Sequence, residues 1–351
     1  MLYQRENPHG GDIYKGTIRA DFSSNINPLG TPTWLLEAMT EALSNAPHYP
    51  DPYCRRAVHA VSEYEDIPED YILLGNGAAA LIYSFCRAVQ PSSALIPVPA
   101  FSEYEAALTL NNTGIIHHFL RRETGFSPDE RLLDDIEQHA PNIVFLCNPN
   151  NPTGRLTDPD LLQKLTELCH SKGTMLFADE CFLEFTSQQD ILKELLPDYP
   201  NLFILKAFTK SYALAGIRIG YLLNSDPHLM QRISAMTQPW DVSLIAQAAA
   251  CAIKRGNGYM EKTRELIRNE REWMTKELSS FGFEVCPSDA NFLLFHAPAG
   301  LDRSLLREHV AIRNCANYIG LQEGWYRAAV RSHNENEILI DALKKISGEM
   351  H

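Results

Sequence analysis

The segment IVFLCNPNNPTG, residues 143–154, joins a run of five apolar residues to a loop that contains three asparagines and two prolines. An apolar run followed at once by turn-forming residues predicts a buried strand that ends where the loop begins. Proline fixes its own φ and restricts the residue before it to extended conformations, so we expect this loop to be rigid. A rigid loop can hold the Asn151 amide at a fixed point, although an ordinary proline-rich turn would have the same composition.

Apolar runs of the same kind recur on both sides of this segment. Amphipathic stretches between them predict helices over residues 78–89 and 159–171, the second with Asp158 as its N-cap and Pro159 at the first helical position. We expect strands at residues 71–74, 94–98, 115–119, 143–147, 174–178 and 202–207. This alternation predicts an α/β fold with a mostly parallel sheet covered by helices on both faces. Ligands of such sheets bind at the carboxyl ends of the strands.

The length of 351 residues predicts about two domains. Residues 46–243 contain the alternating pattern and are expected to form the large domain. Residues 1–45 together with 244–351 are expected to form an N-terminal arm and a smaller α+β domain. Its expected elements are a long charged helix at 258–280, strands near 290–295 and 326–331, and a closing helix from residue 336.

The composition excludes several classes of protein. With 31 Lys and Arg against 44 Asp and Glu, the net charge is −13, which argues against a protein that mainly binds nucleic acid or an anionic membrane surface. The eight cysteines form no CxxC pair, so we expect free thiols in a reducing compartment. The start, MLYQRENPHGGDIYKG, has no apolar run typical of a secretory signal, and no run elsewhere is long enough to span a membrane. With no HExxH motif or Cys/His cluster either, we expect a cytoplasmic enzyme without a metal site.

Two further loops follow predicted strands and carry residues suited to binding. GNGAAA at residues 75–80 leads into a helix whose free N–H groups can bind an anion, although many such glycine turns only reverse the chain. Asp179 comes directly after the strand at 174–178, where a buried carboxylate must be paired. It is therefore expected either to meet a protonated ring nitrogen or to cap a helix.

The fourth loop, after the strand at 202–207, contains Lys210 and Arg218. Lys210 lies among apolar and small residues, which disfavour its ammonium form and make a reactive neutral amine accessible. The guanidinium of Arg218 suits a phosphate group. A lysine and an arginine at this spacing also occur by chance in most chains.

The order and spacing of these loops resemble the fold-type-I pyridoxal-phosphate enzymes of the aminotransferase superfamily. The residues that carry the resemblance are NPNNPTG at 148–154, Asp179–Glu180 and TKSYALAGIRIGY at 209–221, and the match extends over nearly the whole chain. It implies the fold of that superfamily, pyridoxal 5′-phosphate as the cofactor and a homodimer.

The resemblance also implies a role for individual residues. Lys210 would form an imine with the cofactor aldehyde, Asp179 would keep the ring nitrogen protonated, and Asn151 would bind the ring O3′. Phe101 would stack on the ring. The residues that would hold the cofactor phosphate are Gly77, Ala78, Thr209, Arg218 and Tyr49 of the partner subunit.

Within the superfamily, the chain resembles the threonine-phosphate decarboxylase family. Histidinol-phosphate aminotransferases usually have tyrosine three residues after the ring-nitrogen aspartate, whereas this chain has Phe182, as the decarboxylases do. Further similar stretches are HGG at 9–11, DFSSNINPLG at 21–30, IRNCANYIGL at 312–321 and YRAAVRS at 326–332. The residues expected around a phosphorylated amino acid are His9, Gly10, Asn25, Asn151, Arg313 and Arg327. Two guanidinium groups suit a substrate with a carboxylate and a phosphate, whereas Arg331 is expected to lie on the surface.

This resemblance implies decarboxylation of O-phospho-L-threonine or O-phospho-L-serine to aminopropanol phosphate or ethanolamine phosphate, for the nucleotide loop of cobamides. The two substrates differ by one methyl group, and no residue predicts which is preferred. A histidinol-phosphate-type aminotransferase is the alternative, because it shares the cofactor loops and the need for a substrate phosphate. A non-catalytic binding protein of the same fold is disfavoured by the intact set of Lys210, Asp179, Asn151 and Arg218.

Overall fold

The computed structural model describes residues 9–14, 16–188, 190–256 and 258–349, so residues 1–8 and 15 of the start expected to lack a secretory signal lie outside the described residues. The helices are α1 (Thr33–Ala42), α2 (Arg55–Glu65), α3 (Gly77–Val89), α4 (Glu103–Thr109), α5 (Arg131–His139), α6 (Pro159–Lys172), α7 (Ile191–Leu195), α8 (Phe208–Ser211), α9 (Pro227–Ser234), α10 (Leu244–Ala252), α11 (Tyr259–Ser280), α12 (Leu301–Arg307) and α13 (His333–Glu349). The strands are β1 (Ala20–Asp21), β2 (Ile72–Gly75), β3 (Ser93–Val98), β4 (Gly114–Phe119), β5 (Ile143–Cys147), β6 (Met175–Asp179), β7 (Leu202–Ala207), β8 (Gly220–Leu223), β9 (Glu284–Val285), β10 (Phe292–His296), β11 (Val310–Ala311), β12 (Arg313–Asn314) and β13 (Trp325–Ala329).

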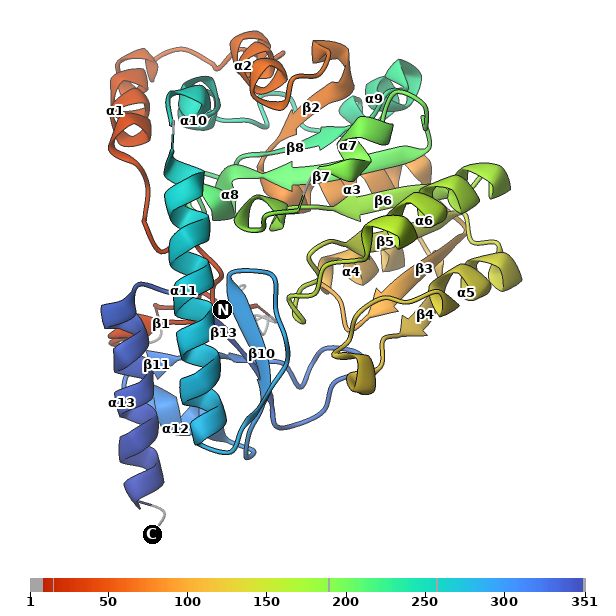
Figure 1. The fold of residues 1–351 in the computed structure, drawn as a ribbon. Helices are drawn as coiled ribbons and strands as arrows, with labels where there is room; N and C mark the ends of the chain where they lie inside the picture. Colours follow the sequence, from red (N-terminus) through yellow and green to blue (C-terminus); the bar gives the residue numbers. More distant parts are fainter. Residues whose placement is uncertain (1–8, 15, 189, 257, 350–351) are drawn as a thin grey trace.

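A seven-stranded sheet in the order β2-β8-β7-β6-β5-β3-β4 forms the centre of the larger part (Figure 1). All neighbouring strands are parallel except β8, which runs antiparallel to both β2 and β7. One face of the sheet packs on α3, α4 and α9, and the other packs on α2, α5, α6 and α7. The predicted α/β fold with helices on both faces is therefore confirmed.

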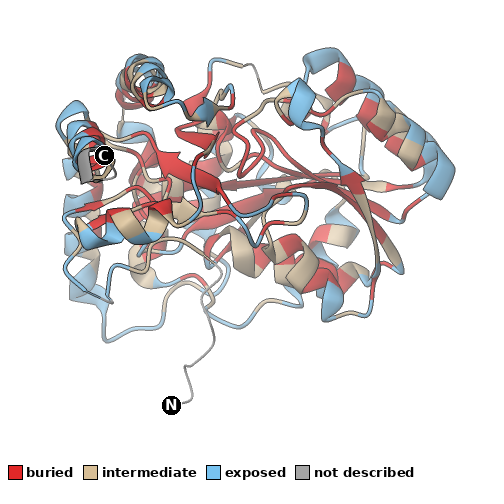
Figure 2. Cartoon of the chain, turned by 90° about the horizontal axis from the view of Figure 1, so that it is seen from below, coloured by how far each residue is buried: buried red, intermediate tan, exposed pale blue. Residues whose placement is uncertain are grey.

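Strand β5 shows why this sheet is buried on both sides. Val144 and Leu146 point into the core on one face, and Ile143, Phe145 and Cys147 point into the core on the other. Side chains alternate between the faces of a strand, so a strand covered on both faces must be apolar throughout. The buried strands between two layers of helices are visible in Figure 2.

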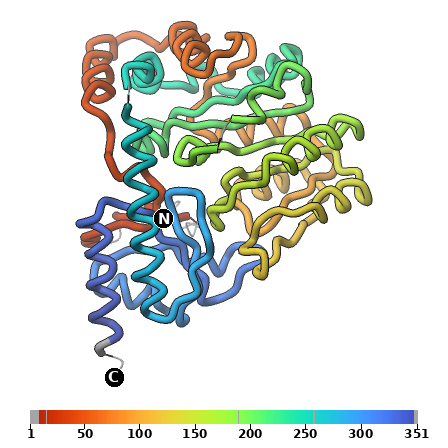
Figure 3. The backbone as a smooth tube through the Cα atoms, in the orientation of Figure 1, coloured from red at the N-terminus to blue at the C-terminus, as the bar shows by residue number. Residues whose placement is uncertain are grey.

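The smaller sheet is antiparallel, in the order β12-β13-β10-β9, and its core includes residues of α11, α12 and α13. Ala20 and Phe22 of the N-terminal segment are buried in the same core, and β1 pairs in parallel with β11. The segment around β1 and the C-terminal part of the chain therefore lie side by side in this part of the molecule (Figure 3).

Helices α1 and α10 contribute to the core of the large sheet, where α10 packs on both α1 and α2. The expected domain boundaries at residues 45 and 243 remain a prediction. Within the described residues, none of the helices combines the length and the apolar character needed to cross a membrane.

The six strands predicted in the alternating region are all present, and Asp158 caps α6 by accepting hydrogen bonds from the N–H groups of Asp160 and Leu161. Strand β8 is not among the predicted strands, because its four residues follow directly on the loop of Lys210 and Arg218. The closing helix begins at His333, three residues earlier than expected.

A cluster of buried charged groups joins β7 to the segments that cover it. Lys206 of β7 is 5% exposed, and its Nζ donates to Glu65 Oε2 at 3.1 Å and to Asp190 Oδ2. Glu65 also accepts hydrogen bonds from Lys193 and Tyr221. Burial raises the pKa of the neighbouring Glu180 well above its usual range, with the nearby Asp190 carboxylate acting in the same direction.

The first prediction concerns this cluster. Replacing Lys206→Met leaves the buried Glu65 and the half-buried Asp190 without their central cation, and we expect the free energy of unfolding to fall by about 3–5 kcal/mol. Denaturant unfolding of the apoprotein measures the change. In the matched variant Lys164→Met, which breaks an exposed ion pair with Glu130, we expect no measurable change. Equal stabilities of the two variants would contradict a stabilising role of Lys206.

Candidate active site

A pocket lies where the carboxyl ends of β5, β6 and β7 meet the N-terminal segment and the small sheet. The predicted site residues that line it are His9, Gly10, Asn25, Ala78, Phe101, Asn151, Asp179, Thr209, Lys210, Arg218, Arg313 and Arg327. Residues absent from the predicted site that also line it are Ser24, Ala79, Cys147, Cys181, Phe182 and Tyr318. Gly77 and Tyr49 are the predicted site residues outside this lining.

Gly77 forms the first turn of α3 directly beside Arg218. Its φ is +78°, a conformation that strains residues with a side chain, and a Cβ there would lie 2.4 Å from Arg218 Nη2 and displace the guanidinium. A Cβ at Gly220 would lie 2.8 Å from the Ala78 backbone nitrogen. The helix N-terminus and the guanidinium therefore form one cradle, which suits an anion such as a phosphate.

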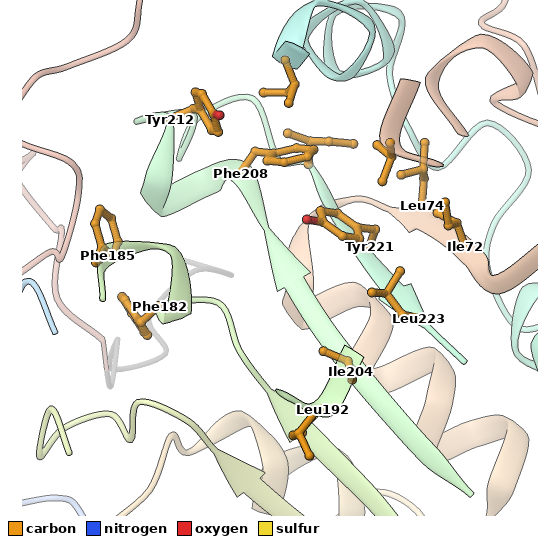
Figure 4. Close-up of a cluster of buried hydrophobic side chains, with 14 of the residues drawn as sticks. Ile72, Leu74, Phe182, Phe185, Leu192, Ile204, Phe208, Tyr212, Tyr221 and Leu223 are labelled. Carbon is orange, nitrogen blue, oxygen red and sulfur yellow. The ribbon is translucent and has the colours of Figure 1, made fainter. Parts of the chain in front are cut away.

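Lys210 is held in the pocket by the aromatic residues on either side of it. Phe208 and Tyr212 are buried in the core, where Phe208 packs on Tyr221 with ring centroids 5.0 Å apart (Figure 4). The Asn27 side chain adds a hydrogen bond of 2.6 Å to the carbonyl of Ser211. The short helix α8 is thus fixed at both ends, although it has only four residues.

The surroundings of Lys210 favour its neutral form. Burial is the largest cause and, together with the positive charges of Arg327 and Arg218, lowers the pKa of Lys210 to about 8. The thiol of Cys181 and the carboxylate of Asp179 act in the opposite direction. Near neutral pH, a larger fraction of this amine is therefore neutral and nucleophilic than of an ordinary lysine.

Asp179 lies buried at the end of β6. Its Oδ1 accepts a hydrogen bond from the Cys181 backbone N–H at 3.0 Å, and its Oδ2 accepts one from the Tyr104 hydroxyl at 2.6 Å. Burial raises the pKa of Asp179, while these hydrogen bonds and the charge of Lys210 oppose the rise. A buried carboxylate facing a pocket suits a protonated ring nitrogen.

Arg327 joins three parts of the site. Its Nη1 donates to Asn151 Oδ1 at 2.5 Å, and its Nη2 donates to the Ser23 carbonyl at 2.7 Å. Among the described residues, neither the buried Arg327 Nε nor the buried Asn25 Oδ1 has a hydrogen-bond partner. Buried polar atoms of this kind need a partner, and both residues line the pocket, so we expect a ligand to bind them.

Arg313 and His9 lie at the pocket with partners of their own. Arg313 Nη2 donates to Asn317 Oδ1 at 2.7 Å, and the guanidinium lies 5.2 Å from the centroid of the Tyr318 ring. His9 is held in place, because its Nε2 lies 2.7 Å from Glu103 Oε1 and its ring contacts Phe101. The hydrogen bond from His9 is the largest cause that lowers the pKa of Glu103.

Tyr49 is placed away from the pocket. Its side chain is 78% exposed and stacks on Trp240 with ring centroids 4.5 Å apart.

Arg331, expected at the surface, is absent from the pocket lining and forms an ion pair with Glu335 in α13, with Nη2 and Oε1 2.9 Å apart.

Tyr104 is a further residue of the site that was not predicted from the sequence. It lies three residues after Phe101, but its partner Asp179 is 75 residues away, and no local pattern joins the two. In the described parts of the chain, no group of three or more His, Cys, Asp or Glu residues is arranged to hold a metal ion.

An amine, a buried carboxylate and an anion cradle at one sheet edge define the class of pyridoxal-phosphate enzymes of fold type I. The chain belongs to the class I and II aminotransferase family, whose model matches residues 18–343. It is therefore an enzyme of a pyridoxal 5′-phosphate-dependent family, and the expected cofactor is confirmed.

Two curated relatives are named as decarboxylases. The threonine-phosphate decarboxylase of Salmonella typhimurium strain LT2 is 33% identical, with 96% of each chain covered. The putative threonine-phosphate decarboxylase of Caldanaerobacter subterraneus subsp. tengcongensis is 36% identical, with 97% of this chain and 94% of the relative covered. A solved histidinol-phosphate aminotransferase from Clostridium acetobutylicum has a TM-score of 0.87 and 31% identity, with 94% of this chain and 99% of that chain covered.

The second prediction follows from the lowered pKa of Lys210. Because a neutral amine is needed to attack an aldehyde, we expect apoprotein mixed with pyridoxal 5′-phosphate to form its visible chromophore faster as pH rises, with a midpoint near 8. Stopped-flow absorbance measures this rate. In Lys210→Ala, borohydride reduction should leave no cofactor attached at position 210. A midpoint near the ordinary lysine value of 10.5 would contradict the effect of burial.

Proposed function

We propose that this protein decarboxylates a phosphorylated amino acid, O-phospho-L-threonine or O-phospho-L-serine. The observation that carries the proposal is the presence of Arg313 and Arg327 in the same pocket as Lys210. A substrate that bears both a carboxylate and a phosphate needs two such cations. The two decarboxylase relatives support the same assignment.

The pocket offers a place for each part of the cofactor. Lys210 would bind its aldehyde carbon, and Asp179 would bind its ring nitrogen. The phosphate would be held by the α3 N-terminus at Gly77 and Ala78, by Thr209 and by Arg218. Phe101 would cover the ring, and Asn151 would bind its O3′.

When bound, pyridoxal 5′-phosphate withdraws electrons from a bond at the Cα of the amino acid. This chain's residues decide which bond that is. Arg327, held by Asn151 and Ser23, has its Nε available for the substrate carboxylate, and Asn25 lines the same pocket. Arg313 would bind the phosphate and thereby fix the rotation about Cα.

Lys210 would supply the proton that replaces the lost carboxylate. With a pKa near 8, its amine can carry a proton at neutral pH and release it to Cα. One C–C bond breaks to give carbon dioxide, and one C–H bond forms. The product from phosphothreonine would be 1-aminopropan-2-yl phosphate, a unit suited to the nucleotide loop of cobamides.

Phe182 favours this reaction over that of a histidinol-phosphate aminotransferase. It is buried, lines the pocket and packs edge-to-face on Phe292 with ring centroids 5.1 Å apart. Because this residue is phenylalanine and not tyrosine, it has no hydroxyl to donate to the cofactor ring. The aminotransferase remains the second candidate, because the solved aminotransferase from Clostridium acetobutylicum shares the fold at 31% identity.

We also propose that the protein is a homodimer. Tyr49 does not line the pocket of its own subunit, and its ring is exposed and stacked on Trp240. In the dimer, Tyr49 of the partner subunit would reach the cofactor phosphate.

The third prediction tests the reaction type. Holoenzyme mixed with phosphothreonine alone should release carbon dioxide in many turnovers, with the original absorbance spectrum restored afterwards. Transfer of the amino group to the cofactor, reversed by a keto acid, would instead establish an aminotransferase. Relative kcat/KM for phosphothreonine and phosphoserine then defines the preferred substrate.

The fourth prediction tests the phosphate contact. In Arg313→Gln, we expect kcat/KM for the phosphorylated substrate to fall by about tenfold or more, the effect of one hydrogen bond to a charged group. Cofactor affinity should be unchanged, because Arg313 is not assigned to the cofactor. The matched variant Arg331→Gln breaks only the pair with Glu335 and should retain wild-type kinetics. Equal losses in the two variants would contradict the assignment.

A further inference from the structure

Tyr104 is a fully buried tyrosine that touches two predicted cofactor-binding residues at once. It lies in α4 and is 1% exposed. Its hydroxyl donates to Asp179 Oδ2 at 2.6 Å, and its ring meets that of Phe101 edge-to-face at 5.7 Å between centroids. A stacked contact with Phe145, at 5.2 Å between centroids and 24° between planes, also holds the ring.

The direction of the hydrogen bond matters for the charge of Asp179. A phenol donates its proton, and a carboxylate accepts one more readily when it is ionised. Burial and the charge of Asp179 raise the pKa of Tyr104 well above its usual range, so its hydroxyl keeps its proton. Tyr104 therefore acts as a permanent donor.

Few other groups compete for this carboxylate. The titratable or charged groups that face it are Tyr104 from α4, Cys147 from β5, Cys181 after β6 and Lys210 from α8. Burial raises the pKa of both thiols, so they are neutral and weak donors. The Tyr104 hydroxyl and the Cys181 backbone N–H donate hydrogen bonds of 2.6 and 3.0 Å to Asp179, and the weakly donating Cys181 thiol adds a further interaction.

We infer that Tyr104 is a positioning residue that acts through Asp179: its hydroxyl keeps this carboxylate ionised, so that the proton between Asp179 and the cofactor ring stays on the ring nitrogen. The inference rests on the proposed role of Asp179 and holds for either reaction type. Without the hydroxyl, the carboxylate loses a charge-stabilising donor and becomes more basic. The shared proton then moves from the ring nitrogen toward Asp179.

The fifth prediction tests this with holoenzyme carrying a cofactor labelled with ¹⁵N at its ring nitrogen. In Tyr104→Phe, we expect the ¹⁵N resonance to move toward that of unprotonated pyridine and kcat to fall by roughly tenfold. Phenylalanine retains the contacts with Phe145 and Phe101. A resonance at the wild-type position would overturn the inference and leave Tyr104 a purely structural residue.

Tyr221→Phe is the matched control. Tyr221 is also 1% exposed and also donates to a buried carboxylate, that of Glu65, but it does not line the pocket. Both variants should lose stability, and only Tyr104→Phe should shift the resonance. A shift of equal size in Tyr221→Phe would likewise contradict the inference.

Two further measurements separate the possible failures. If Asp179→Asn leaves the ¹⁵N resonance unchanged, the proposed role of Asp179 is itself wrong.

If Tyr104→Phe does not fold, a fluorinated tyrosine at position 104 provides a stronger donor in the same shape. A more protonated ring lowers the pH midpoint of the holoenzyme's visible absorbance. We therefore expect the fluorinated tyrosine to lower this midpoint. An unchanged or raised midpoint would overturn the inference.

Discussion

The parallel pairing of β5, β6 and β7 is the constraint on which the site depends. Cys147 is in register with Asp179, and Asp179 with Leu205, so the three strands end at the same edge of the sheet. The loops that carry Asn151, Asp179 and Lys210 therefore start side by side. Because the core covers both faces of the sheet, this edge is also a place where charge is poorly hydrated.

The side chains that line the pocket at this edge carry an excess of positive charge. Among the described lining residues, four cationic side chains face one carboxylate, although the chain as a whole carries a net charge of −13. Neighbouring cations and burial both disfavour the ammonium form of Lys210, which makes the amine reactive. The same cations suit phosphate and carboxylate groups, so reactivity and substrate binding arise from a single electrostatic arrangement.

The ends of the chain complete the pocket. Asn25 and Ser23 come from the N-terminal segment, and Arg313 and Arg327 come from the small sheet, while Asn27 binds the backbone beside Lys210. Arg327 connects the small sheet to the loop of Asn151 by a buried hydrogen bond. The position of the small sheet on the large one is thus linked directly to the geometry that holds the substrate.

The sequence by itself determined the strands, the α/β class and the loops that bear Asn151, Asp179, Lys210 and Arg218, because periodicity and turn residues are local signals. It did not identify β8, whose four residues merge with a functional loop. Only the tertiary structure decided the partners: Tyr104 with Asp179 across 75 residues, and Arg327 with Asn151 across 176. Such pairs depend on which side chains packing brings together in a low-dielectric interior, and no spacing along the chain records that.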